Sequence, residues 1–134
     1  MNRKLNTEEI RRVSVDEYRR MAKIPLVLVL DNVRSMHNIG AVLRTADAFC
    51  IEKVVLCGIT ATPPNNEIHK SALGAEFSVC WEYSPEAQTP VRTLRDEGYR
   101  VLAVEQTQDS TPLGSLHIEG AIKYALVLGN EVSG

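Results

Sequence analysis

The sequence lacks the features that mark several classes of protein. It holds only three cysteines in 134 residues, scattered without metal-ligand spacing, which predicts buried, reduced thiols at Cys50, Cys57 and Cys80. No apolar run approaches the ~18 residues that a membrane span needs. Residues 1–20 are charged throughout and lack the apolar stretch of a signal peptide, so we expect a cytoplasmic protein.

Neither sign of charge dominates the chain, whose formal net charge is −2, but the charge is unevenly distributed. Residues 1–23 hold seven basic and four acidic residues, a balance of +3, whereas the remaining eight basic and thirteen acidic residues give −5. We expect residues 1–23 to form a basic helical extension of a domain over 24–134. A solvated helix face is the alternative to phosphate contacts. The candidates for such contacts are Arg11, Arg12, Arg19 and Arg20.

Apolar runs alternate with helical patterns along the chain. Ser14 and Glu17 form a capping-box pattern that predicts a short helix to about residue 21. Further helices are expected over about 38–50, 68–76 and 89–98. Continuous apolar runs predict strands buried in the sheet at 24–30 and 53–59, and further strands are expected at 79–83, 99–106 and 123–130. This alternation predicts an α/β fold with a mainly parallel sheet and flanking helices.

Local signals place the ends of two of these helices. Asn38 is a good N-cap for the helix over 38–50, and Thr89 and Gly98 are expected to bound the helix over 89–98. Residues at helical spacing predict that the 38–50 helix buries one apolar stripe. That stripe consists of Ile39, Val42, Leu43, Ala46 and Phe49.

Unusual polar residues and glycines follow the predicted strands, at the edge where parallel sheets bind ligands. Gly40 stands in the first turn of a helix, where glycine costs about 0.5–1 kcal/mol relative to alanine. We therefore expect a ligand or another backbone to approach it closely. Arg44 follows one helical turn later on the same face and is predicted to point toward the helix N-terminus, where anions are favoured.

Two separated stretches match a known pattern. "HNIGAVLRTADAF" (37–49) resembles motif 1 of the SpoU (TrmH-like) RNA 2′-O-ribose methyltransferases, N-x-G-x-x-x-R-T/S-A. "LVLGNEVSG" (126–134) resembles motif 2, a hydrophobic strand followed by G-x-E-x-x-G. The segment "CGITATPPNNEIHKSALGAE" (57–76) is also similar to the region between the two motifs. The pair is far more specific than either motif alone.

The resemblance implies a SPOUT-type α/β domain with a C-terminal trefoil knot and S-adenosylmethionine as methyl donor. It implies a homodimer with the active site at the subunit interface, acting on a ribose 2′-hydroxyl of tRNA or rRNA. The catalytic set would be Asn38, Arg44 and Glu131. The cofactor would rest against Val104, Glu105, Gln106, Leu128, Gly129 and Asn130. Arg34 and Lys70 are further candidates for RNA contacts at the rim, and no metal site is expected.

The family's third motif, a Ser-Leu-Asn-x-Ser-like segment, does not occur within the 134 residues. We therefore expect the domain to be C-terminally incomplete, without its knot segment. An alternative function is a non-catalytic RNA-binding or interaction module on the same scaffold. A generic nucleotide-binding domain is disfavoured, because the chain has neither a P-loop nor a G-x-G-x-x-G turn.

Overall fold

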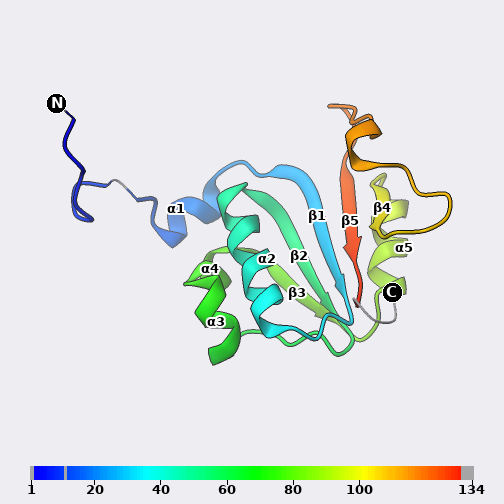
Figure 1. Ribbon diagram of the computed structural model, residues 1–134, viewed down its shortest axis with the longest axis horizontal. Helices are drawn as coiled ribbons and strands as arrows, with labels where there is room; N and C mark the ends of the chain where they lie inside the picture. The colour runs from blue at the N-terminus through cyan, green and yellow to red at the C-terminus, as the bar shows by residue number, and fades with distance from the viewer. Residues whose placement is uncertain (1, 11, 131–134) are drawn as a thin grey trace.

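A computed structural model describes residues 2–10 and 12–130 of the chain. Its five strands form one all-parallel sheet in the order β3-β2-β1-β5-β4 (Figure 1). This confirms the expected α/β fold. The strands are β1 (Ile24–Asp31), β2 (Ile51–Cys57), β3 (Trp81–Ser84), β4 (Arg100–Val104) and β5 (Tyr124–Leu128). The helices are α1 (Val15–Arg20), α2 (Met36–Ala48), α3 (Asn66–Ala72), α4 (Ala75–Ser78), α5 (Gln88–Asp96) and the 3-10 turn η1 (Leu113–Ser115).

Strand β1 is the centre of the sheet. It pairs with β2 on one side and with β5 on the other, so that Leu28 lies opposite both Val54 and Leu126. The four residues 27–30 within this strand are all buried. A strand with partners on both sides and helices over both faces must be apolar without interruption, which explains the run that predicted it.

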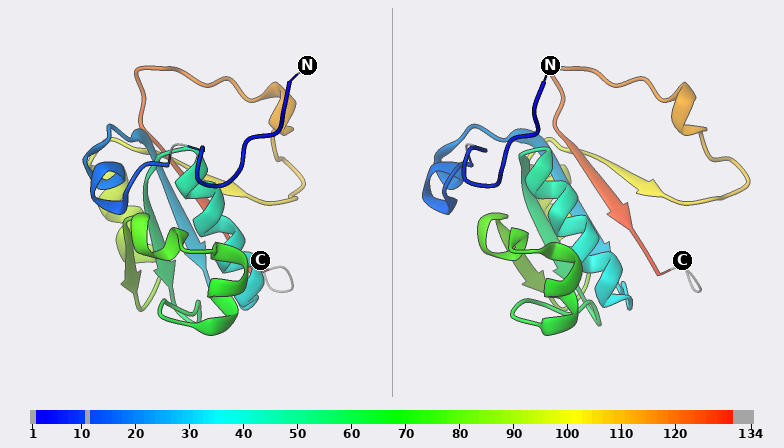
Figure 2. Two further views of the ribbon diagram at one scale, coloured as in Figure 1. Left: turned by 90° about the vertical axis from the view of Figure 1, so that its left-hand side faces the viewer. Right: turned by 60° about the vertical axis from the view of Figure 1, so that its left-hand side comes forward.

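The two faces of the sheet carry different helices. Leu28 and Leu30 point toward α2, α3 and α4, whereas Val27 and Val29 point toward α5. On the first face the helices lie over β1, β2 and β3. Figure 2 shows α2, α3 and α4 on the side of β1, β2 and β3, whereas Leu113 of η1 and Leu116 after it line a groove on the same face with Leu102 of β4 and Leu126 of β5.

Three helix starts differ from the expectation. The helix expected over 68–76 begins earlier, as α3 with Asn65 as its N-cap, and it ends at Ala72, so that α4 is a separate helix. Helix α2 begins at Met36, and its N-cap is Ser35, whose side chain accepts a hydrogen bond from the Asn38 backbone N–H at 3.1 Å. Helix α5 begins at Gln88 with Ala87 as its N-cap, so Thr89 lies inside the helix, and its hydroxyl donates to the Glu86 carboxylate at 2.9 Å. In each case the N-cap is a residue that lies earlier in the chain than expected. The predicted cap at Ser14 is confirmed.

The predicted apolar stripe of α2 is right except at its end. Ile39, Leu43 and Ala46 are fully buried and Val42 is half-buried, but the side chain of Phe49 is 65% exposed. Phe49 is the C-cap of the helix, where the chain leaves the helical path and turns the side chain off the buried face.

Gly40 lies against another backbone. A Cβ atom there would stand 2.4 Å from the Ile68 carbonyl oxygen and 2.1 Å from Ser71 Oγ, both on α3. The Ser71 hydroxyl also donates to the His37 carbonyl oxygen at 2.8 Å. Glycine is therefore needed for the packing of α2 on α3. Of the two expected causes, a ligand or another backbone, the structure shows another backbone.

The opposite end of α2 is held by α1. Tyr18 of α1 is buried, and its hydroxyl donates to the Asp47 carbonyl oxygen at 3.1 Å. Burial raises the pKa of Tyr18 to about 12, so it stays a neutral donor to this helix end. Arg19 of the same helix donates to the Phe77 carbonyl oxygen at 2.8 Å. Residues before α1 extend away from the body of the protein (Figure 1).

The cysteines do not share one environment. Cys57, at the end of β2, is fully buried, and burial raises the pKa of its thiol to about 11, with smaller contributions from Asp31 and Glu82. Cys50 is half-buried and Cys80 is exposed. The prediction of burial is therefore right for Cys57, right in part for Cys50, and wrong for Cys80, which precedes the edge strand β3. All three are free thiols.

We expect Gly40→Ala to destabilise the protein by about 2 kcal/mol. Overpacking against the α3 backbone costs roughly 1–3 kcal/mol and exceeds the ~1 kcal/mol that alanine adds through helix propensity. Urea denaturation followed by circular dichroism measures the change. Gly114→Ala is the matched control, because a Cβ at Gly114 meets nothing within 4 Å. Equal stability of Gly40→Ala and the control would contradict the close contact.

We expect Cys80 to react with iodoacetamide at pH 8 in the native protein while Cys57 stays unmodified. A thiol with a pKa of about 11 is almost entirely protonated at that pH, and the fully buried Sγ is also inaccessible. Peptide mass spectrometry after timed alkylation reads out both sites. Alkylation in urea serves as the control, since all three thiols should then react at similar rates.

Candidate functional site

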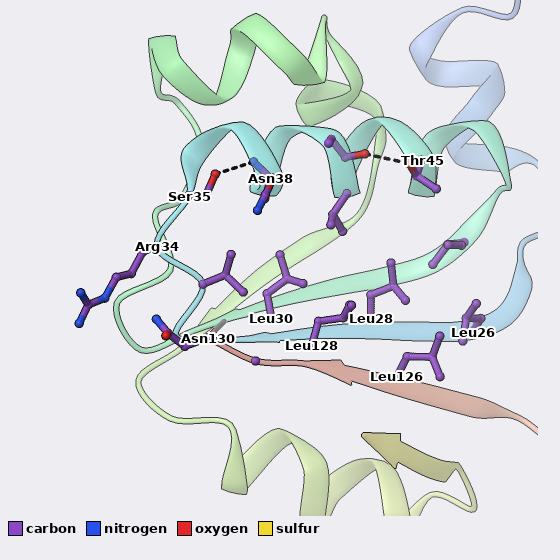
Figure 3. A pocket seen from close by; sticks show the side chains of 15 residues that line it. Leu26, Leu28, Leu30, Arg34, Ser35, Asn38, Thr45, Leu126, Leu128 and Asn130 are labelled. Carbon is purple, nitrogen blue, oxygen red and sulfur yellow. Dashed lines mark hydrogen bonds between the residues drawn. The ribbon is translucent and has the colours of Figure 1, made fainter. Parts of the chain in front are cut away.

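A groove of about 640 Å³ lies at the junction of β1, β5 and α2 (Figure 3). This is the point where the chain order of the sheet reverses, with β2 and β3 on one side of β1 and β5 and β4 on the other. Open parallel sheets bind ligands at such a point. The groove is lined by Leu26, Leu28, Leu30, Val33, Arg34, Ser35, Asn38, Ala41, Val42, Thr45, Ile51, Leu126, Leu128, Gly129 and Asn130.

The floor of the groove is a row of leucine side chains. Alternate residues of a strand point to the same face, so Leu26, Leu28 and Leu30 of β1 stand beside Leu126 and Leu128 of β5. Figure 3 shows these side chains directed toward α2. Polar groups gather where the strands end. The groove therefore combines an apolar floor with a polar mouth, the usual composition of a small-molecule site.

The mouth is formed by the start of α2. Because Ser35 caps the helix, the Asn38 side chain is not used as the cap, and it lies on the side of α2 that faces the groove (Figure 3). Arg34 precedes the cap, and its guanidinium points outward from the leucine floor in the same view. The N-terminus of a helix carries partial positive charge, so this mouth favours an anionic or electron-rich group.

Thr60 and Asn32, which the sequence analysis did not single out, hold this mouth in place. The Thr60 hydroxyl donates to the Leu30 carbonyl oxygen at 3.2 Å and accepts from the Val33 N–H at 3.0 Å. The Asn130 side chain donates to the Asn32 carbonyl oxygen at 3.2 Å and so joins the ends of β5 and β1. The sequence does carry one signal for Asn32. It is an asparagine that directly follows a buried strand, and asparagine tolerates the left-handed backbone conformation of a turn.

The residues predicted to be catalytic do not all meet in the groove. Asn38 lines it, together with Ala41, Val42 and Thr45 from the same face of α2. Arg44 is exposed and is not among the lining residues, because it follows Gly40 on the part of the helix turned toward α3. Glu131 lies outside the described residues.

The residues predicted to bind the cofactor fall into two groups. Leu128, Gly129 and Asn130 line the groove. Val104 is the last residue of the neighbouring strand β4, where it pairs with Leu128, and Glu105 and Gln106 follow it. They share the same edge of the sheet, but all three are exposed and none lines the groove.

The candidate RNA-binding residues lie at the two opposite ends of α2. Arg34 precedes the helix, and Lys70 stands beside its start on α3, where it pairs with Glu67 at 2.9 Å. Arg19 and Arg20 belong to α1, which contacts the other end, about 20 Å away for a 13-residue helix. Arg12 is exposed in the preceding segment, and Arg11 lies outside the described residues. The structure does not gather these residues into one patch.

Across residues 2–10 and 12–130, no three His, Cys, Asp or Glu side chains gather as a metal-binding group. In the same part of the chain, no helix is both long and apolar enough to cross a membrane.

Comparison with known proteins identifies the family. The model of the SpoU rRNA Methylase family matches residues 25–134. The 23S rRNA (guanosine-2′-O-)-methyltransferase RlmB of Nitrosomonas europaea is 34% identical over 109 residues, 81% of this chain and 41% of that protein. The RlmB of Neisseria meningitidis is 29% identical over 119 residues, 89% of this chain and 46% of that protein.

The fold agrees with the same family. An rRNA methyltransferase from Sinorhizobium meliloti superposes with a TM-score of 0.74 at 25% identity, over 87% of this chain and 45% of that one. The chain spans less than half the length of these relatives. One family therefore accounts for both the pair of sequence motifs and the all-parallel sheet. The chain belongs to the SpoU rRNA Methylase family.

Proposed function

We propose that this chain carries the methyltransferase domain of an enzyme that transfers a methyl group from S-adenosylmethionine to a ribose 2′-hydroxyl of tRNA or rRNA. One observation carries the proposal. Asn38 of the first motif and Gly129 and Asn130 of the second line one groove, although about 90 residues separate them in the sequence. Two motifs of one family that meet at the switch point of the sheet form a site together.

The residues present suit this cofactor. A groove of about 640 Å³ with a leucine floor and a polar mouth fits a ligand that is partly flat and apolar and partly charged. Leu128, Gly129 and Asn130 would hold it, and when bound it supplies a methyl group on a sulfonium. A related rRNA methyltransferase from Sinorhizobium meliloti, 26% identical with a TM-score of 0.72, has been solved with AdoMet bound.

The chain's own residues would position the hydroxyl and manage its charge. A ribose hydroxyl is a poor nucleophile, so orientation and deprotonation are the difficult parts of the reaction. Arginine has a pKa above about 12 and rarely gives up its proton. We therefore assign Arg44 to holding the adjacent phosphate and stabilising the developing alkoxide. Asn38 would fix this arrangement from the mouth of the groove, and Glu131 is assigned the role of orienting Arg44 by charge.

Arg44 fits a site that is shared between two subunits. It is exposed and lies off the groove of its own chain. In a homodimer with the active site at the interface, the exposed guanidinium of one protomer would serve the groove of its partner. The open apolar floor is also the kind of surface that association covers. This dimer is part of the proposal.

RNA would be held by basic residues at the mouth of the groove and farther from it. Arg34 at the mouth and Lys70 beside it are suited to contact the RNA phosphates near the reacting ribose. The basic segment 1–23 is proposed as an extension that contacts phosphates farther along the RNA. These residues lie at opposite ends of α2, so they suit an extended ligand better than a small one. We place the enzyme in the cytoplasm.

We expect Arg44→Ala to abolish methylation and to leave the affinity for S-adenosylmethionine within about twofold, since the lost group would act on RNA and not on the cofactor. The assay measures labelled methyl transfer to total RNA and identifies 2′-O-methylated nucleosides by mass spectrometry. Cofactor affinity is measured by calorimetry. Arg92→Ala, an exposed arginine on α5 at the opposite face of the sheet, is the matched control.

The assay is run on the chain itself and on a version joined to the C-terminal segment of a SpoU methyltransferase that contains the third motif. Transfer by either version supports the proposed activity. Binding of RNA without transfer by both versions would favour a non-catalytic RNA-binding module. Equal loss of cofactor binding and methylation in Arg44→Ala would contradict the division of roles.

We expect the double variant Arg12→Ala/Arg20→Ala to bind RNA more weakly and with a shallower dependence on salt. Each lost phosphate contact lowers the slope of log affinity against log salt by about 0.7–0.9. These two side chains are exposed, and unlike Arg19 they do not bond to α4. Fluorescence anisotropy at several salt concentrations measures the slope. Arg92→Ala/Arg95→Ala on α5 is the control, and a slope equal to that of the parent chain would favour a solvated helix face.

A further inference from the structure

A chain of hydrogen bonds crosses the carboxyl edge of the sheet from β3 to β5. The Tyr83 hydroxyl at the end of β3 donates to the Gly58 carbonyl oxygen at 2.8 Å. The backbone after β2 then donates to Asn32, which follows β1, and Asn32 in turn accepts from Asn130, which follows β5. Four of the five strand ends are thus connected, and in this chain of hydrogen bonds Asn32 links the turn after β2 to the residue after β5.

Asn32 makes three bonds at once because of its backbone conformation. Its φ of 54° lies in the left-handed region, which asparagine tolerates better than most residues. In this conformation its Oδ1 accepts from the Ile59 N–H at 3.0 Å, and its own N–H donates to the Cys57 carbonyl oxygen at 3.2 Å. Its carbonyl oxygen is left to accept the Asn130 side-chain amide at 3.2 Å.

Gly58 shows how closely the neighbouring turn fits this side chain. A Cβ atom at Gly58 would lie 2.0 Å from Asn32 Oδ1, a distance that no side chain can occupy. The φ of Gly58 is also in the left-handed region, at 66°. The Asn32 amide therefore fills the space that glycine leaves, and the two turns hold each other in position.

We propose that Asn32 is a positioning residue for the cofactor site. It holds Gly129 and Asn130, which line the groove after β5, in alignment with the start of α2. Its side chain is anchored to the turn after β2, its carbonyl oxygen holds Asn130, and the residues that follow it lead directly to the Ser35 cap and Asn38. Asn130 and Asn38 line the groove from opposite sides. The inference rests on the proposed function of that groove, but the coupling between the turns is a property of the fold alone.

The test compares Asn32→Gly and Asn32→Asp. Glycine keeps the left-handed backbone and removes the Oδ1 acceptor, whereas aspartate keeps an acceptor for the Ile59 N–H. Asn65→Gly is the matched control, since Asn65 also uses Oδ1 to accept backbone N–H groups, at 2.9 and 3.1 Å, on the same edge but outside the groove. Amide hydrogen exchange of Ile59, Gly129 and Asn130 and the affinity for S-adenosylmethionine are measured for each.

We expect Asn32→Gly to speed exchange at Ile59 and at Gly129–Asn130 and to weaken S-adenosylmethionine binding by about five- to tenfold, the effect of one lost hydrogen bond. Asn32→Asp should restore both within about twofold. Exchange at Gly129–Asn130 unchanged in Asn32→Gly, or a loss of affinity equal to that of Asn65→Gly, would overturn the proposal.

The two hypotheses fail in different ways. If the parent chain, with or without the added third motif, does not bind S-adenosylmethionine, the proposed function of the groove is contradicted. The exchange rates then still decide whether Asn32 couples the turn after β2 to the turn after β5, and an absence of coupling overturns the positioning role independently of any ligand.

Discussion

The site depends on the pairing of β1 with β5. This pairing brings together Asn32 and Asn130, which are 98 residues apart in the sequence, and it places the leucines of both strands on one face. Closing so long a loop costs conformational entropy, which the apolar burial along the central strand offsets. Without this pairing the two motifs would not lie close together in space.

Helix α2 is the second rigid part of the site, and its position is determined at both ends. At its start, Ser35 caps the first turn and Gly40 allows the backbone of α3 to approach. At its end, the Tyr18 hydroxyl satisfies a carbonyl oxygen of the last turn. A helix held in this way keeps Asn38 at a constant position over the groove, which a site for an oriented reaction requires.

The inner strands β1, β2 and β5 could be predicted from the sequence because burial between neighbouring strands and helices requires a nearly continuous apolar run. The helix starts could not. Ser35 and Asn38 stand three residues apart and both are good N-caps, so a local pattern cannot choose between them. The choice falls on Ser35, and it leaves Asn38 to line the groove. Phe49 has the right spacing for burial, but the C-cap turns it away from the helix face that the spacing assumes.

By itself the sequence determined the class of fold, the edge of the sheet at which the site lies, and the family, because these follow from apolar runs and from motifs that are local in the chain. Only the tertiary structure decided which of the motif residues meet. It brought Asn38 to Asn130 and its neighbours, left Arg44 outside the groove, and explained Gly40 by the α3 backbone. The physical reason is that strand order and helix packing are set by contacts between distant residues, which no local pattern contains.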